Sequence, residues 1–375
     1  MGKQSTKLYV GMDVHKDSID LAIGEERGEV RHYARIGGDS VALMRTVRKL
    51  ESLAQPLLFV YEAGPCGFVI QRMLAARGHE CWVVAPSNTP RRVRDRIKTD
   101  RRDALKLCGL ARAGEIAPIN VPDAADEAMR DLVRAREDAV GVQRQVRQRL
   151  GALLLRNDIR YSGKSTWTTA HERWIARLVI PSPAQRLTFE EYVRAIGEAS
   201  ERVKRLTDAL EEQLEHWRWK RVVAALQACR GIQLIHALRI VAELGDLSRF
   251  THPRQLMAYL GLIPTENSSG PRHRQGAITK AGNSSARRAM IEAAWAYQHH
   301  AAVSPIIARR QAGLPKATIA IAWKAQVRLS ARFRKLRARG LHKNKIVVAI
   351  ARELTGFVWA IAHEIKPHSV EMRKR

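Results

Sequence analysis

The sequence contains few cysteines, few aromatic residues and no long apolar run. Only four of its 375 residues are cysteines, no two of them form a Cys-x-x-Cys pair, and they stand far apart at Cys66, Cys81, Cys108 and Cys229. This spacing argues against a disulfide framework and against a zinc site, so we expect reduced thiols in a cytoplasmic protein. No apolar run approaches the roughly 20 residues that span a bilayer, and the N-terminus leads into a strand-like segment without the pattern of a signal peptide.

Acidic residues are scarce relative to basic ones. The chain has 65 Lys and Arg against 37 Asp and Glu, which gives a net charge of +28. Self-repulsion of such an excess opposes a compact state, and a polyanionic partner offsets it. The phosphate backbone of a nucleic acid is the commonest such partner. A membrane surface is the alternative, but without a spanning segment the sequence favours nucleic acid and no membrane.

Strand and helix patterns alternate in the first third of the chain. Three consecutive strands are followed by a helix, a strand, a helix and a strand, predicted at residues 7–13, 18–24, 30–36, 40–53, 57–61, 67–77 and 80–84. This is the chain order of the ribonuclease H-like fold, and its parallel strands need helical crossovers. We therefore predict an α/β domain of the RuvC-like type, followed by a helix at residues 101–113.

The rest of the chain is predicted to be mostly helical. Two long helices, at residues 124–156 and 189–219, pair either as an antiparallel hairpin or as a dimerising coiled coil, with an irregular segment at 161–183 between them. Farther on, two helices joined by a turn at 230–232 are predicted at 224–244. A Gly/Ser-rich loop at residues 265–276 follows, and further helices are predicted at 283–300, 316–337 and 346–364. We predict three domains: the RuvC-like domain at 1–123, a helical, coiled-coil linker at 124–221, and a mostly α C-terminal domain at 222–375.

Four carboxylates stand where a phosphoryl-transfer enzyme needs them. Asp13 and Glu62 each end an apolar strand, while Asp100 and Asp103 lie three residues apart and share one helical face. Two-metal chemistry uses carboxylates to bridge hard cations about 3.5–4 Å apart, and Mg²⁺ prefers oxygen ligands. The sequence therefore predicts a catalytic site for Mg²⁺ or Mn²⁺ at these four residues.

The same acids could instead have structural roles. Asp100 could cap the helix, and Asp103 could favour its positive end without any metal. An actin-like nucleotide-binding fold shares the strand pattern, but it requires a Gly-Thr turn after the first aspartate, whereas Val14-His15-Lys16 follows Asp13. The matched positions of all four acids in one fold favour the metal site.

A second group of candidate site residues, two serines followed by basic residues, lies in the C-terminal half. Ser268, Ser269 and Gly270 precede a strongly basic stretch, whose arginines could activate a serine and hold a phosphate. The alternative is a DNA-binding face without chemistry. The candidate nucleic-acid-binding residues are Lys16, Arg101, Arg102, Arg272, Arg274, Lys280, Arg287 and Arg288.

In these residues the chain resembles the DEDD transposases of the insertion sequence 110 family. The resemblance covers nearly the whole chain, and its main motifs are Gly11-Met12-Asp13-Val14-His15-Lys16, Tyr61-Glu62-Ala63-Gly64, Lys98-Thr99-Asp100-Arg101-Arg102-Asp103-Ala104, Gly261-Leu262-Ile263-Pro264, Ser268-Ser269-Gly270 and Ile278-Thr279-Lys280-Ala281-Gly282-Asn283. It implies magnesium on the four acids and a nucleophilic serine, which we place at Ser269 with Ser268 as the second candidate.

The resemblance also implies partners. It implies a homo-oligomer, a dimer or a tetramer, that exchanges strands between donor and target double-stranded DNA through a phosphoserine intermediate, as a serine recombinase. It implies guidance by a structured non-coding RNA, the bridge RNA, and a place on the bacterial nucleoid. Two other functions stay open: a metal-dependent hydrolytic junction resolvase, and a non-catalytic nucleic-acid-binding protein. Whether one active site combines residues of two subunits also stays open.

Overall fold

A computed structural model describes residues 7–90, 99–266 and 274–365. It divides the chain into two compact units, Met1–Val121 and Pro122–Arg375. The helices predicted as a linker belong to the second unit together with the C-terminal helices. The division into three domains therefore stays a prediction.

The first unit is built on a five-stranded mixed sheet. Its strands are β1 Leu8–Val14, β2 Ser18–Glu25, β3 Arg31–Gly37, β4 Leu57–Glu62 and β5 Glu80–Val84, in the order β3-β2-β1-β4-β5. β1 runs antiparallel to β2 and parallel to β4, and β4 runs parallel to β5. A mixed α/β sheet with this order is consistent with the predicted RuvC-like domain.

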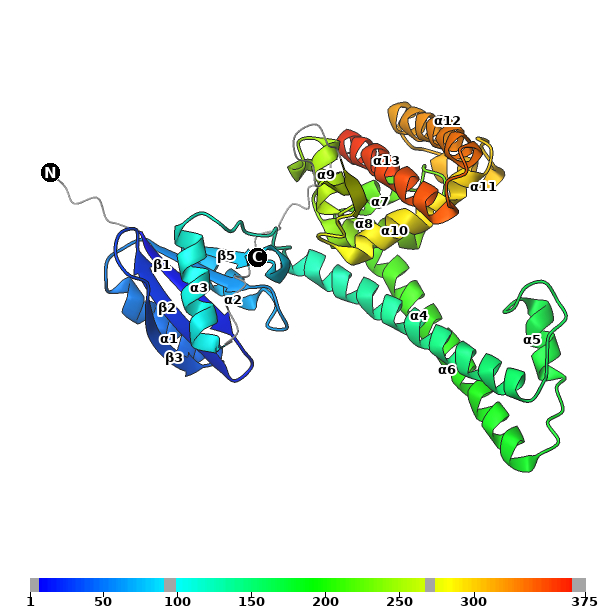
Figure 1. The fold of residues 1–375 in the computed structure, drawn as a ribbon, viewed down its shortest axis with the longest axis horizontal. Helices are drawn as coiled ribbons and strands as arrows, with labels where there is room; N and C mark the ends of the chain where they lie inside the picture. The colour runs from blue at the N-terminus through cyan, green and yellow to red at the C-terminus, as the bar shows by residue number, and fades with distance from the viewer. Residues whose placement is uncertain (1–6, 91–98, 267–273, 366–375) are drawn as a thin grey trace. The chain divides into compact units, whose positions relative to one another are not determined.

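Helices cover both faces of this sheet (Figure 1). Helices α1 (Ser40–Glu51) and α2 (Val69–Ala76) pack on one face, where Met12 and Tyr61 are buried. Helix α3 (Asp100–Arg112) packs on the other, against Leu58 and Val60. Because side chains alternate along a strand, successive residues of β1 point to opposite faces of the sheet, and so do successive residues of β4. A short 3₁₀ helix, Pro86–Asn88, follows β5.

In the second unit, α4 (Ala124–Arg156) runs outward and α6 (Pro183–His216) returns beside it (Figure 1). Polar pairs join them: Arg136 Nε donates to Thr207 Oγ1 at 2.7 Å, and Gln143 Nε2 donates to Ser200 Oγ at 3.0 Å. The two long helices thus form a hairpin within one chain, and a coiled coil between chains stays a prediction.

The segment between the long helices is more regular than predicted. It contains α5 (Thr169–Ala176), which begins where Thr168 Oγ1 accepts a hydrogen bond from His171 N at 3.3 Å. A serine or threonine at this cap position satisfies an otherwise unpaired N–H. Helix α6 also begins earlier than predicted, at Pro183, because proline suits the first turn of a helix.

The remaining elements form a helical bundle with one small β-hairpin. They are α7 Lys220–Leu226, α8 Leu234–Leu244, a 3₁₀ helix Leu247–Arg249, α9 Pro253–Tyr259, β6 Pro264–Glu266, β7 Gln275–Ile278, α10 Ser284–Ala294, a 3₁₀ helix Trp295–Gln298, α11 Pro305–Gln311, α12 Lys316–Ala338 and α13 Lys343–Glu364. β6 and β7 pair at the two ends of the segment predicted as a loop. Among the described residues, α13 is the one helix long and apolar enough to cross a membrane, but Ile350, Leu354 and Val358 bury its apolar face in the bundle.

An ion pair between a half-exposed arginine and a buried glutamate fastens α4 to this bundle. Arg134 donates two hydrogen bonds to Glu243 of α8, at 2.8 and 2.9 Å, and Asn283 Nδ2 donates a third at 2.6 Å. Desolvation is the largest single influence and raises the pKa of Glu243, but these hydrogen bonds together with the charges of Arg134 and Arg130 leave the pKa below its ordinary value. Asn283 also caps α10 by accepting a hydrogen bond from Ala286 N. The buried carboxylate of Glu243 therefore connects α4, α8 and α10.

Candidate catalytic centre

Two parallel strands bring Asp13 and Glu62 to one end of the sheet. Met12 of β1 pairs with Tyr61 of β4, so the residues that follow them, Asp13 and Glu62, lie side by side near the ends of their strands. Met12 and Tyr61 both point into the core under α1 and α2. By alternation, Asp13 and Glu62 point to the opposite face, on which α3 lies.

The first turn of α3 supplies the other two acids. Thr99 caps the helix, accepting a hydrogen bond from Arg102 N, and Asp100 and Asp103 follow within the first turn. The cap is therefore Thr99 and not Asp100. Acids at this position also interact favourably with the positive end of the helix dipole, so a structural role and a metal-binding role are compatible.

Asp13 and Asp100 converge on a histidine. His15 Nε2 lies 3.1 Å from Asp13 Oδ2 and 3.5 Å from Asp100 Oδ1. One ligand atom from each of these residues lies within 4.8 Å of the others, a grouping able to hold a metal ion. Burial raises the pKa of the Asp13 carboxyl, and the charges of Asp103 and Asp100 raise it further, while His15 lowers it. A cation at this place would relieve the crowding of negative charge.

The donor atoms fit a divalent metal ion. Carboxylate oxygens suit Mg²⁺ and Mn²⁺, and an imidazole nitrogen is accepted by Mn²⁺ and later transition metals more readily than by Mg²⁺. Asp13 and Asp100 belong to the group, and Asp103 is close enough for its charge to act on Asp13. Glu62 is adjacent to Asp13 by strand register but lies outside the group of three.

Two residues near the centre were missed by sequence reasoning. His15 follows Asp13 by two residues, and that spacing alone was a weak signal. Asp20 of β2 pairs directly with Asp13, so it faces α3 as well, and it is buried. His32 Nε2 lies 2.9 Å from Asp20 Oδ1. A buried aspartate is rare unless it has a partner, and Asp20 within an apolar strand could have revealed this neighbour.

Arg35 links Asp20 to the acidic group. Its Nε lies 3.6 Å from Asp20 Oδ2 and its Nη2 lies 3.7 Å from Asp100 Oδ2. The guanidinium is largely exposed, so these ion pairs are weak. Lys16, Arg101 and Arg102 are also exposed close in sequence to the acids. The centre therefore combines crowded acids with basic side chains beside them, as binding of a phosphodiester requires.

The structure describes only the residues on either side of the predicted serine centre. Ser268, Ser269 and Arg272 lie outside the described residues, between β6 and β7 of the small hairpin. Of the other basic candidates in this half, Arg274, Lys280 and Arg288 are exposed. Arg287 is half-buried, and its Nη1 donates to the backbone oxygens of Leu260 and Ala281 at 3.1 and 2.9 Å. Arg287 therefore holds the chain around the hairpin.

Both halves of the chain match known families. Residues 10–157 match the family of IS110-type DEDD transposases, and residues 223–310 match the Transposase IS116/IS110/IS902 family. The transposase y4qE of Sinorhizobium fredii is 41% identical over 96% of this chain and 90% of its own length. The transposase of insertion sequence element IS1533 from Leptospira borgpetersenii is 30% identical over 89% of this chain and 97% of its own.

The chain belongs to the IS110 family of DEDD transposases. It is a transposase, an enzyme that cuts and rejoins DNA, and DNA is its substrate. The family match spans the positions of Asp13, Glu62, Asp100 and Asp103. Enzymes of this family typically use divalent metal, in agreement with the acidic group in the first unit.

In this transposase, Gly11 of β1 lets α3 pack closely against the sheet. A Cβ atom at Gly11 would lie 2.3 Å from Ala104 O and 2.6 Å from Cys108 N, and the backbone of α3 cannot yield without moving Asp100 and Asp103. We expect Gly11→Ala to lower the free energy of unfolding by about 1–3 kcal/mol and to reduce strand transfer at least tenfold. Urea unfolding and a strand-transfer assay measure the two effects.

Gly109 is the matched control for this prediction. It lies on α3, and a Cβ atom added to it would meet nothing within 4 Å among the described residues. Gly109→Ala should therefore stabilise the helix by about 0.5–1 kcal/mol, and its strand transfer should equal that of the wild type. Equal activity of both variants would contradict the idea that close packing of β1 and α3 sets the catalytic geometry.

Proposed function

We propose that this transposase cuts and rejoins DNA through a covalent bond to Ser269, with Mg²⁺ or Mn²⁺ held by Asp13, Glu62, Asp100 and Asp103. The observation that supports the proposal most directly is the convergence of Asp13, Asp100 and His15 within 4.8 Å. A divalent ion bound there would polarise the phosphate oxygens.

The serine step conserves the number of phosphodiester bonds. The Ser269 oxygen bonds to phosphorus and the P–O bond of the DNA strand breaks. The serine proton ends on the oxygen of the leaving strand, which departs with a free hydroxyl. In the second step, the hydroxyl of another strand attacks the phosphoserine and releases Ser269. Because each step exchanges one P–O bond for another, rejoining needs no external energy source.

The partners of the reaction are part of the proposal. We infer a homo-oligomer, a dimer or a tetramer, which holds donor and target double-stranded DNA and is guided by a structured non-coding RNA in the bacterial nucleoid. The net charge of +28 supports polyanionic partners, and exposed Lys16, Arg101, Arg274 and Lys280 offer contacts to phosphate. Sequencing the nucleic acid that co-purifies with the protein tests this part, and a heterogeneous mixture without a recurring RNA would contradict it.

Trapping separates the proposal from hydrolysis. Wild-type transposase incubated with donor DNA and Mg²⁺ or Mn²⁺, then denatured, should carry DNA in a covalent adduct stable to detergent. A hydrolytic junction resolvase would use the same acids with water as the nucleophile and would leave nicked DNA without an adduct. A non-catalytic binding protein would leave the DNA intact.

A further inference from the structure

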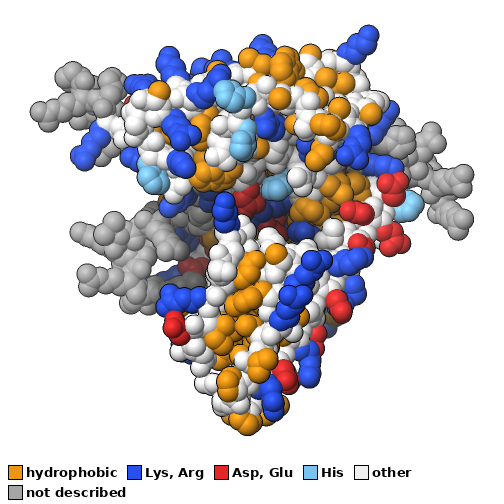
Figure 2. All heavy atoms as spheres, turned by 90° about the vertical axis from the view of Figure 1, so that its right-hand side faces the viewer, with side chains coloured by type: hydrophobic (Ala, Val, Ile, Leu, Met, Phe, Trp, Pro, Cys, Tyr) orange, Lys and Arg blue, Asp and Glu red, His pale blue; other side chains and the backbone are white. Residues whose placement is uncertain are grey.

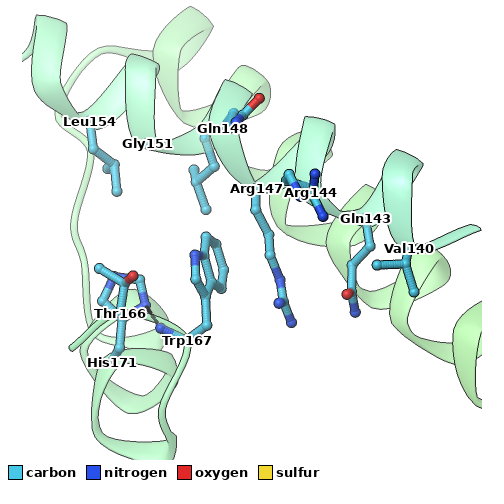
Figure 3. A pocket seen from close by; sticks show the side chains of 11 residues that line it. Val140, Gln143, Arg144, Arg147, Gln148, Gly151, Leu154, Thr166, Trp167 and His171 are labelled. Carbon is cyan, nitrogen blue, oxygen red and sulfur yellow. Dashed lines mark hydrogen bonds between the residues drawn. The ribbon is translucent and has the colours of Figure 1, made fainter. Parts of the chain in front are cut away.

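A cavity of about 420 Å³ lies at the far end of the helical hairpin, between α4 and the residues that lead into α5 (Figure 3). It lies within the second unit and shares no residue with the acidic centre. Arg147, Gln143 and Trp167 stand next to one another in it. The lining is mixed: an aromatic ring, a guanidinium and an amide stand beside apolar residues that include Val140, Leu150 and Leu154.

Arg147 and Trp167 form a stacked pair. The guanidinium carbon of Arg147 lies 4.7 Å from the centre of the Trp167 ring. Arg147 Nε is buried and has no hydrogen-bond partner among the described residues. Gln143 lies one helical turn before Arg147, and Arg144 lines the same cavity. Planar guanidinium and indole groups provide flat faces, while the amide offers both a donor and an acceptor.

The backbone holds Trp167 in an unusual conformation. Its φ is +61°, in the left-handed region that bulky residues rarely adopt. Trp167 N donates to His171 Nδ1 at 3.2 Å, and the two rings meet edge to face at 5.0 Å. Desolvation lowers the pKa of the buried His171, which keeps its Nδ1 able to accept this bond. Strained residues held in place by their neighbours concentrate at functional sites.

Charge around the cavity favours an anionic ligand. Residues 140–188 contain nine Lys and Arg but only two acids, Asp158 and Glu172. Figure 2, which faces this end of the hairpin, shows Lys and Arg side chains, with some Asp and Glu among them, beside apolar ones. The exposed apolar residues include Leu155, Val179 and Leu187, which could contact protein, but the excess of positive charge fits a phosphodiester chain better.

We propose that this cavity binds one unpaired nucleotide of a nucleic acid strand. The base stacks on the Arg147–Trp167 pair, Gln143 contacts the edge of the base, and Arg144 contacts the neighbouring phosphates. Only an unpaired base offers a free face to such a pair, since a base within a duplex is covered on both sides. DNA and RNA present the same base and phosphate chemistry, so either strand fits the site.

Fluorescence of a labelled strand tests the proposal on the full-length protein. Short DNA and RNA strands, of about ten nucleotides, carry a single 2-aminopurine, and the matching duplexes serve as the paired form. We expect stacking to quench the 2-aminopurine in a single strand and Trp167→Ala to weaken its binding about tenfold. Trp167→Phe should keep most of the affinity. Arg147→Lys, which preserves the charge but removes the planar group, should weaken binding as Trp167→Ala does.

Trp323→Ala is the matched control, because Trp323 is an exposed tryptophan of the same unit on α12. Circular dichroism and sedimentation of each variant report on folding and oligomeric state. Quenching with the DNA strand or with the RNA strand supports the site. The strand whose 2-aminopurine is quenched identifies the nucleic acid that the site binds. Equal affinity of Trp167→Ala and Trp323→Ala, equal affinity of Arg147→Lys and wild type, or preference for the duplex would overturn it. A change of oligomeric state in Trp167→Ala without a change in strand affinity would overturn it in favour of a protein contact.

Discussion

Replacing Asp13 by asparagine is expected to reduce strand transfer by about 10³-fold or more. The amide would keep the size of the side chain but remove the charge that we propose holds a divalent cation beside Asp100 and His15. Loss of a metal ligand removes several kcal/mol of transition-state stabilisation, and each 1.36 kcal/mol is about a factor of ten in rate. Timed strand-transfer assays measure the rate, and titration with Mn²⁺ by electron paramagnetic resonance measures metal binding.

The fold should survive this change. The raised pKa of Asp13, caused first by burial, shows that the ionised carboxylate is unfavourable where it stands, so a neutral asparagine should leave the melting temperature unchanged or raise it. Asp17→Asn is the control, since Asp17 is an exposed acid in the turn after β1. Wild-type strand transfer by Asp13→Asn, or weakened Mn²⁺ binding in Asp17→Asn alone, would refute the metal site at Asp13.

Sequence patterns were sufficient to predict where the four acids lie in the fold. Asp13 and Glu62 each follow a continuous apolar run, and such runs belong to central parallel strands whose ends meet at one edge. The three-residue spacing of Asp100 and Asp103 likewise predicts one helical face, and both lie in the first turn of α3. These features depend on local periodicity, which a single sequence carries.

Contacts that depend on strand register were not predictable in this way. Asp20 faces α3 only because β2 pairs with β1 in the register that sets Asp20 opposite Asp13. His15 joins Asp13 and Asp100 because the chain turns after β1 and α3 lies close against that strand. Such contacts arise from tertiary packing, so the third member of the candidate metal-binding group was found only in the structure.

The long helices show the same limit. They were predicted to pair as a hairpin or as a coiled coil, because their apolar spacing was too irregular to fix the oligomeric state. Arg136 and Gln143 in fact point across to Thr207 and Ser200 of the same chain. The cavity at Trp167 depends equally on α5, whose cap at Thr168 was not recognised within the segment predicted to be irregular.

Replacing Ser269 by alanine is expected to eliminate the covalent protein–DNA adduct. The serine oxygen is the only atom through which the proposed intermediate is attached, so its removal abolishes the first step and, with it, strand transfer. The measurement is detergent-stable labelling of the protein by end-labelled donor DNA. Ser284→Ala serves as the control, because Ser284 is an exposed serine at the start of α10 and should keep wild-type labelling.

Ser268→Ala resolves the choice between the adjacent serines. Labelling that persists in Ser269→Ala and disappears in Ser268→Ala would transfer the nucleophile to Ser268. Labelling that persists in both variants would refute a nucleophile in this segment. Cleavage that continues in Ser269→Ala without any adduct would instead support a hydrolytic enzyme in which water attacks.

The Asp13 and Ser269 variants together separate metal binding from nucleophilic attack. Asp13→Asn should lose both Mn²⁺ binding and the adduct, because the phosphate is no longer polarised when serine attacks. Ser269→Ala should lose the adduct but bind Mn²⁺ as tightly as the wild type, because the acids of the first unit are unchanged. If the serine variant also lost Mn²⁺ binding, the two residues would not act independently. The proposal that Asp13 binds the metal while Ser269 attacks the phosphate would then be refuted.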